Sequence, residues 1–231
     1  LFILTNKIKN VFSGKEKIKV KKKYLKKNLS TVKFVKEILK KKNLTDFGSK
    51  KIYLNRKKIL KNKIKNYGGA ADLNLIYNIS IITRPKNILE SGVALGWSSL
   101  AFLQAIKENK VGCLSSIDMP YMDKNKVSYV GLAVPTELKR NWKLYKYPDR
   151  VILQSLIKKD IKFDIVHYDS DKSYYGRMWF YKKIWNHIRS GGFFISDDVK
   201  DNYAFIDFAK YLNKNYYLIK SKNKLSGIII K

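Results

Sequence analysis

One short stretch constrains the fold of this chain more than any other. It reads Asn87-Ile-Leu-Glu90-Ser-Gly92-Val-Ala-Leu-Gly96-Trp-Ser98-Ser-Leu, an apolar run that ends in an acid and leads into a glycine turn. Strand, turn and helix in this order are typical of the start of a doubly wound α/β sheet that binds a nucleoside-containing ligand. The glycines let the backbone turn tightly, and the helix that follows, from about Trp97 to Lys107, directs free N–H groups to the same place. The Gly-x-x-x-Gly spacing disfavours a dinucleotide, because dinucleotide enzymes use Gly-x-Gly-x-x-Gly.

Downstream of this stretch, short apolar segments alternate with helical patterns, which predicts a largely parallel sheet closed by an antiparallel hairpin. The predicted strands are 88–91, 113–118, 142–147, 163–168, 193–196, 216–220 and 227–230. Helices are predicted over 29–39, 51–65, 72–83, 174–188 and 202–213.

Composition excludes several classes of protein. Cys113 is the single cysteine and there are two histidines, so one chain holds neither a disulfide framework nor a cysteine or histidine metal cluster. The sequence has no apolar run near the roughly 20 residues of a membrane span, and its first residues lack a signal-peptide pattern. We expect a cytoplasmic protein.

Positive charge is concentrated at the start of the chain. The formal net charge is +31, and residues 1–65 account for +20 of it. We therefore divide the chain into a basic, partly helical extension (1–65), with residues 1–30 as a poorly ordered or loosely docked arm, and an α/β domain (66–231). A basic arm is typical of nucleic-acid binding. Only six of the 49 basic residues are arginine, however, and the abundance of Lys, Asn, Ile and Tyr also fits an A/T-rich genome, so nucleic acid is an open but not favoured partner.

Acidic residues stand at the carboxyl ends of four predicted strands, at Glu90, Asp118, Asp169 and the pair Asp197 and Asp198. In an open α/β sheet the ligand lies beyond the carboxyl ends of the strands, so these acids are expected at one edge. Asp118 lies 26 residues after Gly92, close to the spacing at which an acid meets ribose hydroxyls. The same residue could instead cap a helix or a turn.

These pieces together resemble a class I S-adenosylmethionine-dependent methyltransferase, and within it a bacterial subgroup. The resemblance rests on five further segments, beginning Tyr67-Gly-Gly-Ala, Val134-Pro-Thr-Glu-Leu, His167-Tyr-Asp-Ser-Asp-Lys-Ser-Tyr, Gly191-Gly-Phe-Phe-Ile-Ser-Asp-Asp and Asn202-Tyr-Ala-Phe. It implies a Rossmann-like sheet of seven strands in the order 3-2-1-4-5-7-6, with the last strand antiparallel. It also implies S-adenosylmethionine bound by Gly68, Glu90, Gly92, Gly96, Trp97 and Ser98, with Asp118 on the ribose.

Two positions depart from the subgroup. Lys172 stands where the subgroup has histidine, and Tyr147-Pro148-Asp149 replaces its Gly-Asp-Ser after strand three. The second departure leaves the adenine contacts undefined, with Asp149 as a weak candidate.

Asp169, Asp197 and Asp198 are three carboxylates at two adjacent strand ends. Unpaired, they would repel one another, and a hard cation such as Mg²⁺ would relieve that conflict. The arrangement also resembles metal-dependent catechol-type O-methyltransferases, in which a lysine three residues after the strand-four Asp takes the substrate proton. The resemblance implies Asp169, Asp197 and Asp198 as ligands of an optional metal, and Lys172 with Asp169 as the catalytic pair. The alternative is that the aspartates cap helices and loops and that Lys172 is one of 43 lysines, with no catalytic role.

His167 is expected in the core, and Tyr174, Tyr175 and Trp179 either wall a substrate pocket or pack in the core.

The expected function is methyl transfer from S-adenosylmethionine to the hydroxyl of a small molecule or a glycan. Two rivals stay open at this stage. One is a metal-using hydroxylase-like enzyme on the same fold, and the other is an RNA-binding or RNA-modifying protein that uses the basic arm.

Overall fold

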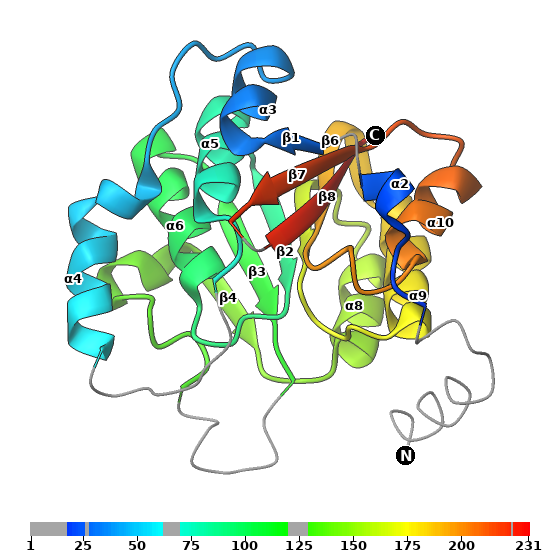
Figure 1. Ribbon diagram of the computed structural model, residues 1–231. Helices are drawn as coiled ribbons and strands as arrows, with labels where there is room; N and C mark the ends of the chain where they lie inside the picture. Colours follow the sequence, from blue (N-terminus) through cyan, green and yellow to red (C-terminus); the bar gives the residue numbers. More distant parts are fainter. Residues whose placement is uncertain (1–17, 26–27, 62–69, 120–128, 223) are drawn as a thin grey trace.

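The computed structural model describes residues 18–25, 28–61, 70–119, 129–222 and 224–231, and it contains one mixed sheet with helices on both faces (Figure 1). Eight strands pair in the order β1-β7-β8-β6-β5-β2-β3-β4. Their bounds are Asn28–Ser30 (β1), Asn87–Ser91 (β2), Cys113–Ile117 (β3), Trp142–Tyr145 (β4), Phe163–Tyr168 (β5), Ile188–Ser196 (β6), Tyr217–Ser221 (β7) and Lys224–Ile230 (β8).

The order of β2 to β8 confirms the expected 3-2-1-4-5-7-6 arrangement. Strands β2 to β6 run parallel, and β8 is antiparallel to both β6 and β7. The fold is therefore the α/β Rossmann-like methyltransferase fold, to which β1 adds an eighth, parallel strand at the β7 edge.

The helices form two layers. Helices α3 (Thr31–Glu37), α5 (Leu73–Thr83) and α6 (Trp97–Asn109) share one apolar core with one face of the sheet. Helices α8 (Asp149–Lys158), α9 (Tyr174–Trp185) and α10 (Ala204–Tyr211) share a second core with the other face, as Figure 1 shows. Strand β2 lies between the layers, because Ile88 packs into the first core and Leu89 into the second. The remaining described helices are α2 (Lys22–Leu25), α4 (Lys51–Leu60) and the short 3-10 turns Phe47–Ser49 and Thr136–Asn141. None of the described helices is both long enough and apolar enough to cross a membrane.

Strand register places the acidic residues at one edge. Ser91 pairs with Ile117 and with Tyr168, and Tyr168 pairs with Ser196. Because these four residues end their strands, the loops that begin after them start side by side. The site is built on this edge.

The N-terminal extension differs from the expected loosely docked arm. Strand β1 is hydrogen-bonded in register to β7, and Val20 is buried with its N–H donating to Lys200 O at 3.2 Å. Further along, Thr31 donates a hydrogen bond to Asp72, the N-cap of α5, and Phe34 and Phe47 are fully buried in the first core. The described part of the extension is thus packed on the catalytic domain. Residues 1–17 and 26–27 lie outside the described residues.

Two local predictions also differ. Helix α8 was not predicted, although its apolar residues recur at helical spacing between charged ones. Strand β6 begins at Ile188, five residues before the predicted start, and carries the Gly191-Gly192 pair that was expected to separate helix from strand.

Candidate active site

A pocket opens at the carboxyl ends of β2, β3 and β5. Four residues predicted to bind the cofactor line it, namely Gly92, Trp97, Ser98 and Asp118, together with the predicted catalytic residue Asp169. The sequence analysis missed the rest of its lining, which consists of Ala70, Ala71, Val93, Ala94, Leu95, Met119 and Ser170. The predicted cofactor residue Gly68 lies outside the described residues.

The two turn glycines have backbone conformations that other residues rarely adopt. Gly92 has φ +93°, and a Cβ on it would lie 2.2 Å from the carbonyl oxygen of Asp169. Gly96 has φ +86°, and its Cβ would lie 2.9 Å from the Cα of Gly131. Both glycines are therefore required by close approach of the protein's own loops. Gly96 is not among the lining residues, so its role is to shape the turn.

Glu90 lies beneath the pocket and does not line it, contrary to the sequence prediction. Its side chain is fully buried and accepts hydrogen bonds from the hydroxyls of Ser98 at 2.5 Å, Ser99 at 2.5 Å and Ser116 at 2.6 Å. Burial raises the pKa of Glu90, against the opposing effects of His167 and the three hydroxyls. The carboxyl group ties the first turn of α6 to β2 and β3, and so fixes the pocket wall from behind.

Asp118 supports the glycine turn from the end of β3. Its Oδ2 accepts hydrogen bonds from the N–H groups of Val93 at 2.7 Å and Ala94 at 2.6 Å. Burial raises the pKa of Asp118, although these N–H groups act in the opposite direction. No described residue donates to its second oxygen, which leaves that oxygen available to a ligand hydroxyl.

The start of α6 offers hydrogen-bond donors to the same pocket. Its N-cap is Gly96, which has no side chain to bond the first N–H groups of this 13-residue helix. Trp97 and Ser98, its first two residues, line the pocket. An N-terminus of this kind attracts an anionic group.

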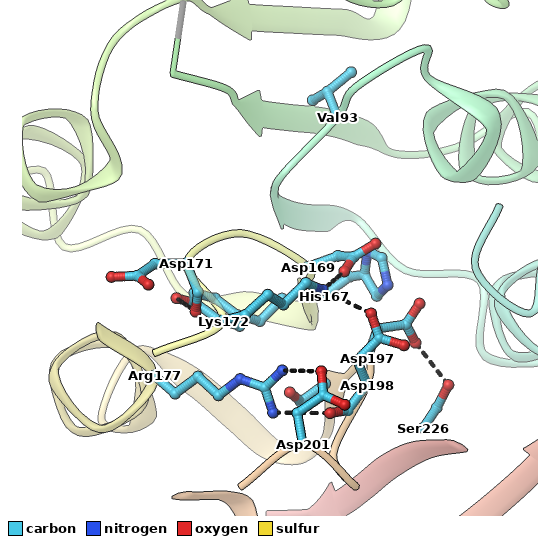
Figure 2. Close-up of polar contacts among 12 residues, drawn as sticks. Val93, His167, Asp169, Asp171, Lys172, Arg177, Asp197, Asp198, Asp201 and Ser226 are labelled. Carbon is cyan, nitrogen blue, oxygen red and sulfur yellow. Dashed lines mark hydrogen bonds and ion pairs between the residues drawn. The ribbon is translucent and has the colours of Figure 1, made fainter. Parts of the chain in front are cut away.

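A lysine lies between the acidic loops that follow β5 and β6 (Figure 2). Lys172 Nζ forms ion pairs with Asp169 and, at 3.1 Å, with Asp198 Oδ2. Burial favours the neutral amine, but the two carboxylates outweigh it and raise the pKa of Lys172. The lowered pKa that a general base near neutral pH would need is not found at this residue.

The third predicted ligand, Asp197, is buried, with one carboxylate oxygen bonded and the other, Oδ2, without a hydrogen-bond partner among the described residues. It is 2% exposed, and its Oδ1 accepts a hydrogen bond from Ser226 on β8 at 2.6 Å, which Figure 2 also shows. Burial raises the pKa of Asp197, against the opposing effect of His167. Among the described residues, no group of three or more His, Cys, Asp or Glu side chains could hold a metal ion. Asp169, Asp197 and Asp198 as arranged therefore do not fit a divalent cation.

Two other predicted residues lie away from the pocket. His167 is fully buried, 3.9 Å from Glu90 Oε1 and packed edge-on against Phe102, in keeping with the expected core position. Asp149 begins α8 and lies 3.5 Å from the hydroxyl of Ser91, so it does not line the pocket.

A second hollow lies beside the start of α9, where an aromatic wall was one of the open alternatives. Tyr174 lines it together with Ile18, Lys21, Lys23, Tyr24, Tyr203, Asp207 and Lys210. The hydroxyl of Tyr174 donates to Asp207 at 2.9 Å, and Tyr24 packs edge-on against Tyr203. Tyr174 is also a buried member of the second core, against which Tyr175 and Trp179 pack.

The pocket and the sheet define an enzyme of the class I methyltransferase type. Residues 89–199 match the family model described as a methyltransferase domain. The chain therefore contains a methyltransferase domain, and its fold is that of class I S-adenosylmethionine-dependent methyltransferases.

Solved structures share the fold at low sequence identity. The SAH-bound methyltransferase PaMTH1 of Podospora anserina aligns with a TM-score of 0.60 at 14% identity, over 79% of this chain and 88% of that one. The O-methyltransferase of Bacillus cereus in complex with SAH has a TM-score of 0.59 at 12% identity, over 87% and 96%. The SAM complex of the O-methyltransferase TomG of Streptomyces achromogenes, involved in tomaymycin synthesis, has a TM-score of 0.60 at 14% identity, over 79% and 91%. No curated protein matches the sequence significantly.

Proposed function

We propose that this methyltransferase acts on oxygen, at a hydroxyl group of a small-molecule acceptor. The observation that carries the proposal is the position of Asp169, which lines the cofactor pocket and contacts Lys172 on its other side. Two of the structural neighbours are named O-methyltransferases, which supports the same chemistry.

The residues of the first pocket fit S-adenosylmethionine. The second oxygen of Asp118 would accept from a ribose hydroxyl, and the uncapped start of α6 would receive the carboxylate of the methionyl part. When bound, the cofactor supplies a methyl group on a sulfonium, whose C–S bond breaks as the acceptor O–C bond forms and a neutral thioether remains.

The protein's own contribution is to place and charge the acceptor oxygen. Positioning accounts for a large share of the rate of such displacements. Asp169 is the carboxylate nearest to both the pocket and Lys172, and it accepts the proton that leaves the acceptor hydroxyl and passes it to solvent. Lys172, whose raised pKa keeps it cationic, is a donor to the resulting oxygen anion. No step is assigned to a metal, because the carboxylates do not fit one.

Two measurements test the proposal. The first is calorimetric titration of the full chain with SAH, with and without Mg²⁺, where we expect one site whose affinity does not change with Mg²⁺. The second is transfer of isotope-labelled methyl from S-adenosylmethionine to a panel of phenols, catechols, sugars and RNA, with the product identified by mass spectrometry. Methylation of nitrogen or carbon acceptors alone would refute the proposal. Methylated RNA, with RNA affinity that falls steeply with salt, would support the RNA-modifying alternative.

A further inference from the structure

We propose that the Lys172 ammonium is the built-in cation of this active site. It occupies the position between two strand-end carboxylates that a divalent ion would otherwise take, and it binds the oxygen of the acceptor directly. The inference rests on the proposed function and deepens it, because it replaces an external metal with a residue of the chain.

The first argument is position. Asp169 follows β5 and Asp198 follows β6, and Lys172 contacts both carboxylates from the loop between β5 and α9 (Figure 2). A cation bridging the two strand ends is therefore already present. Because Asp169 also lines the cofactor pocket, the ammonium lies one side chain away from it.

The second argument is charge balance. Arg177 is fully buried on α9, donates to the carbonyl oxygen of Asp198 at 3.1 Å and lies 3.9 Å from Asp201 Oδ2. Together Lys172 and Arg177 supply two positive charges to the loop of residues 198–201. A divalent ion added here would meet repulsion from two fixed cations, and of the third predicted ligand, Asp197, one oxygen is bonded to Ser226 and the other is buried.

The third argument is that the backbone holds both partners in place. Asn202 is 2% exposed, and its Nδ2 donates to the carbonyl oxygen of Lys172 at 2.8 Å. Asp198, two residues after the end of β6, has φ +53°, a left-handed backbone conformation that is uncommon for a residue other than glycine. The side chain of Lys172 is nevertheless 40% exposed, so its backbone is held while part of the side chain stays accessible to a ligand.

The chemistry follows from the donor count. An ammonium has three N–H groups, and Asp169 and Asp198 accept two of them. No other described residue pairs with Lys172 Nζ, which leaves the third for the acceptor oxygen. One positive charge, already shared with two carboxylates, stabilises an oxygen anion less than a divalent ion does. The site therefore suits a hydroxyl that ionises readily, and we assign it a phenolic acceptor rather than a sugar hydroxyl.

The test is a titration of the full chain with Mn²⁺. The electron paramagnetic resonance signal of the unbound ion measures how much Mn²⁺ is bound. Four proteins are compared: wild type, Lys172→Met, Lys172→Arg, and Lys158→Met as a matched loss of an exposed lysine at the end of α8. We expect Lys172→Met to bind one Mn²⁺ at least about 10-fold more tightly than the other three, because only this variant leaves Asp169 and Asp198 without a cation. Thermal unfolding of each variant checks that it is folded.

Two outcomes overturn the inference. If wild type binds Mn²⁺ as tightly as Lys172→Met, the ammonium does not hold the position. If no variant binds Mn²⁺, the carboxylates do not define a cation position at all. Neither result depends on methyl transfer, so failure of this inference and failure of the proposed O-methylation are separable, the latter being judged by SAH binding and product analysis alone.

Activity provides a second readout once a phenolic acceptor is found. Wild-type turnover is expected to persist in EDTA, and Lys172→Met is expected to lose about 10²- to 10³-fold, the usual effect of removing one donor to a developing oxyanion. Mn²⁺ should restore part of the lost rate in this variant only. Loss of wild-type turnover in EDTA would contradict the inference.

Discussion

The hydroxyl of Ser98 donates a hydrogen bond of 2.5 Å to Glu90 Oε1, and so joins a residue that lines the pocket at the end of β2 to a carboxyl group with no exposed surface. Glu90 receives two more hydroxyls, from Ser99 on α6 and Ser116 on β3. A buried carboxylate with three donors is well bonded but still desolvated, and desolvation sets the direction of its pKa shift.

This relationship predicts how stability depends on pH. The pKa of Glu90 is raised in the folded protein. Its contribution to the free energy of unfolding is therefore fully present below about pH 4.3, the pKa of a glutamate in an unfolded chain, and is lost as pH rises through the pKa of the folded state. Glu90→Gln removes that titration while keeping a hydrogen-bonding side chain of the same size. We expect the free energy of unfolding of Glu90→Gln, relative to wild type, to increase between pH 4 and pH 8. Urea unfolding at both pH values measures it, and an unchanged difference between the two proteins would show that Glu90 is not the titrating group.

The sequence was informative where structure is local. Gly92 and Gly96 marked a turn because their spacing lies within one strand–turn–helix unit, and Asp118 was recognisable from its position after the next strand. Glu90 was assigned to the cofactor by the resemblance to the methyltransferases. Its three serine partners come from α6 and β3, however, and that convergence depends on packing that spacing alone does not encode.

Non-local features could not be predicted. Strand β1 has three residues and pairs with residues of β7 that lie 190 positions later, so no local sequence pattern predicts it. The ion pair of Lys172 with Asp198 joins two loops 26 positions apart, which is why three carboxylates looked unpaired in the sequence. No sequence pattern on the aromatic-rich helix α9 singled out Arg177, although this residue balances the charge of the loop after β6.

The conformation of Gly92 predicts a coupled loss of stability and binding. In Gly92→Ala the new Cβ would meet the Asp169 carbonyl, so the loop after β5 must move, and we expect a loss of about 1–3 kcal/mol in unfolding free energy. SAH affinity should fall with it, because the loop carries Asp169 and Ser170 of the pocket. Gly191→Ala is the matched control, since Gly191 also has positive φ (+75°) but nothing lies within 4 Å of its added Cβ. Urea unfolding and calorimetry compare the two variants. Equal effects would mean that backbone strain alone, without the Asp169 contact, explains the result.

The N-terminal extension is predicted to stabilise the catalytic domain. Deleting residues 1–30 removes the β1–β7 pairing and the burial of Val20, and burial of one aliphatic side chain alone contributes about 1.5–3 kcal/mol. We expect a lower melting temperature for this variant than for one lacking residues 1–17, which keeps every described contact. Differential scanning calorimetry of both truncations provides the measurement. Identical melting temperatures would show that β1 and α2 add nothing to the fold.

Asp118 offers the most direct separation of binding from folding, because one oxygen serves the protein and the other is open to the ligand. Asp118→Asn keeps an oxygen that can accept from Val93 and Ala94 while removing the charge and one acceptor. Losing a hydrogen bond to a charged group costs about 1.5–3 kcal/mol, so SAH affinity should fall by roughly 10- to 100-fold with little change in stability.

Asp118→Ala also leaves the two turn N–H groups without their acceptor, so it should lose stability as well as affinity. Calorimetric titration with SAH and urea unfolding distinguish the two effects, and Asp160→Asn, at a fully exposed carboxylate, is the control for charge alone. Wild-type SAH affinity in Asp118→Asn would remove this residue from the ribose site and leave it as the support of the glycine turn.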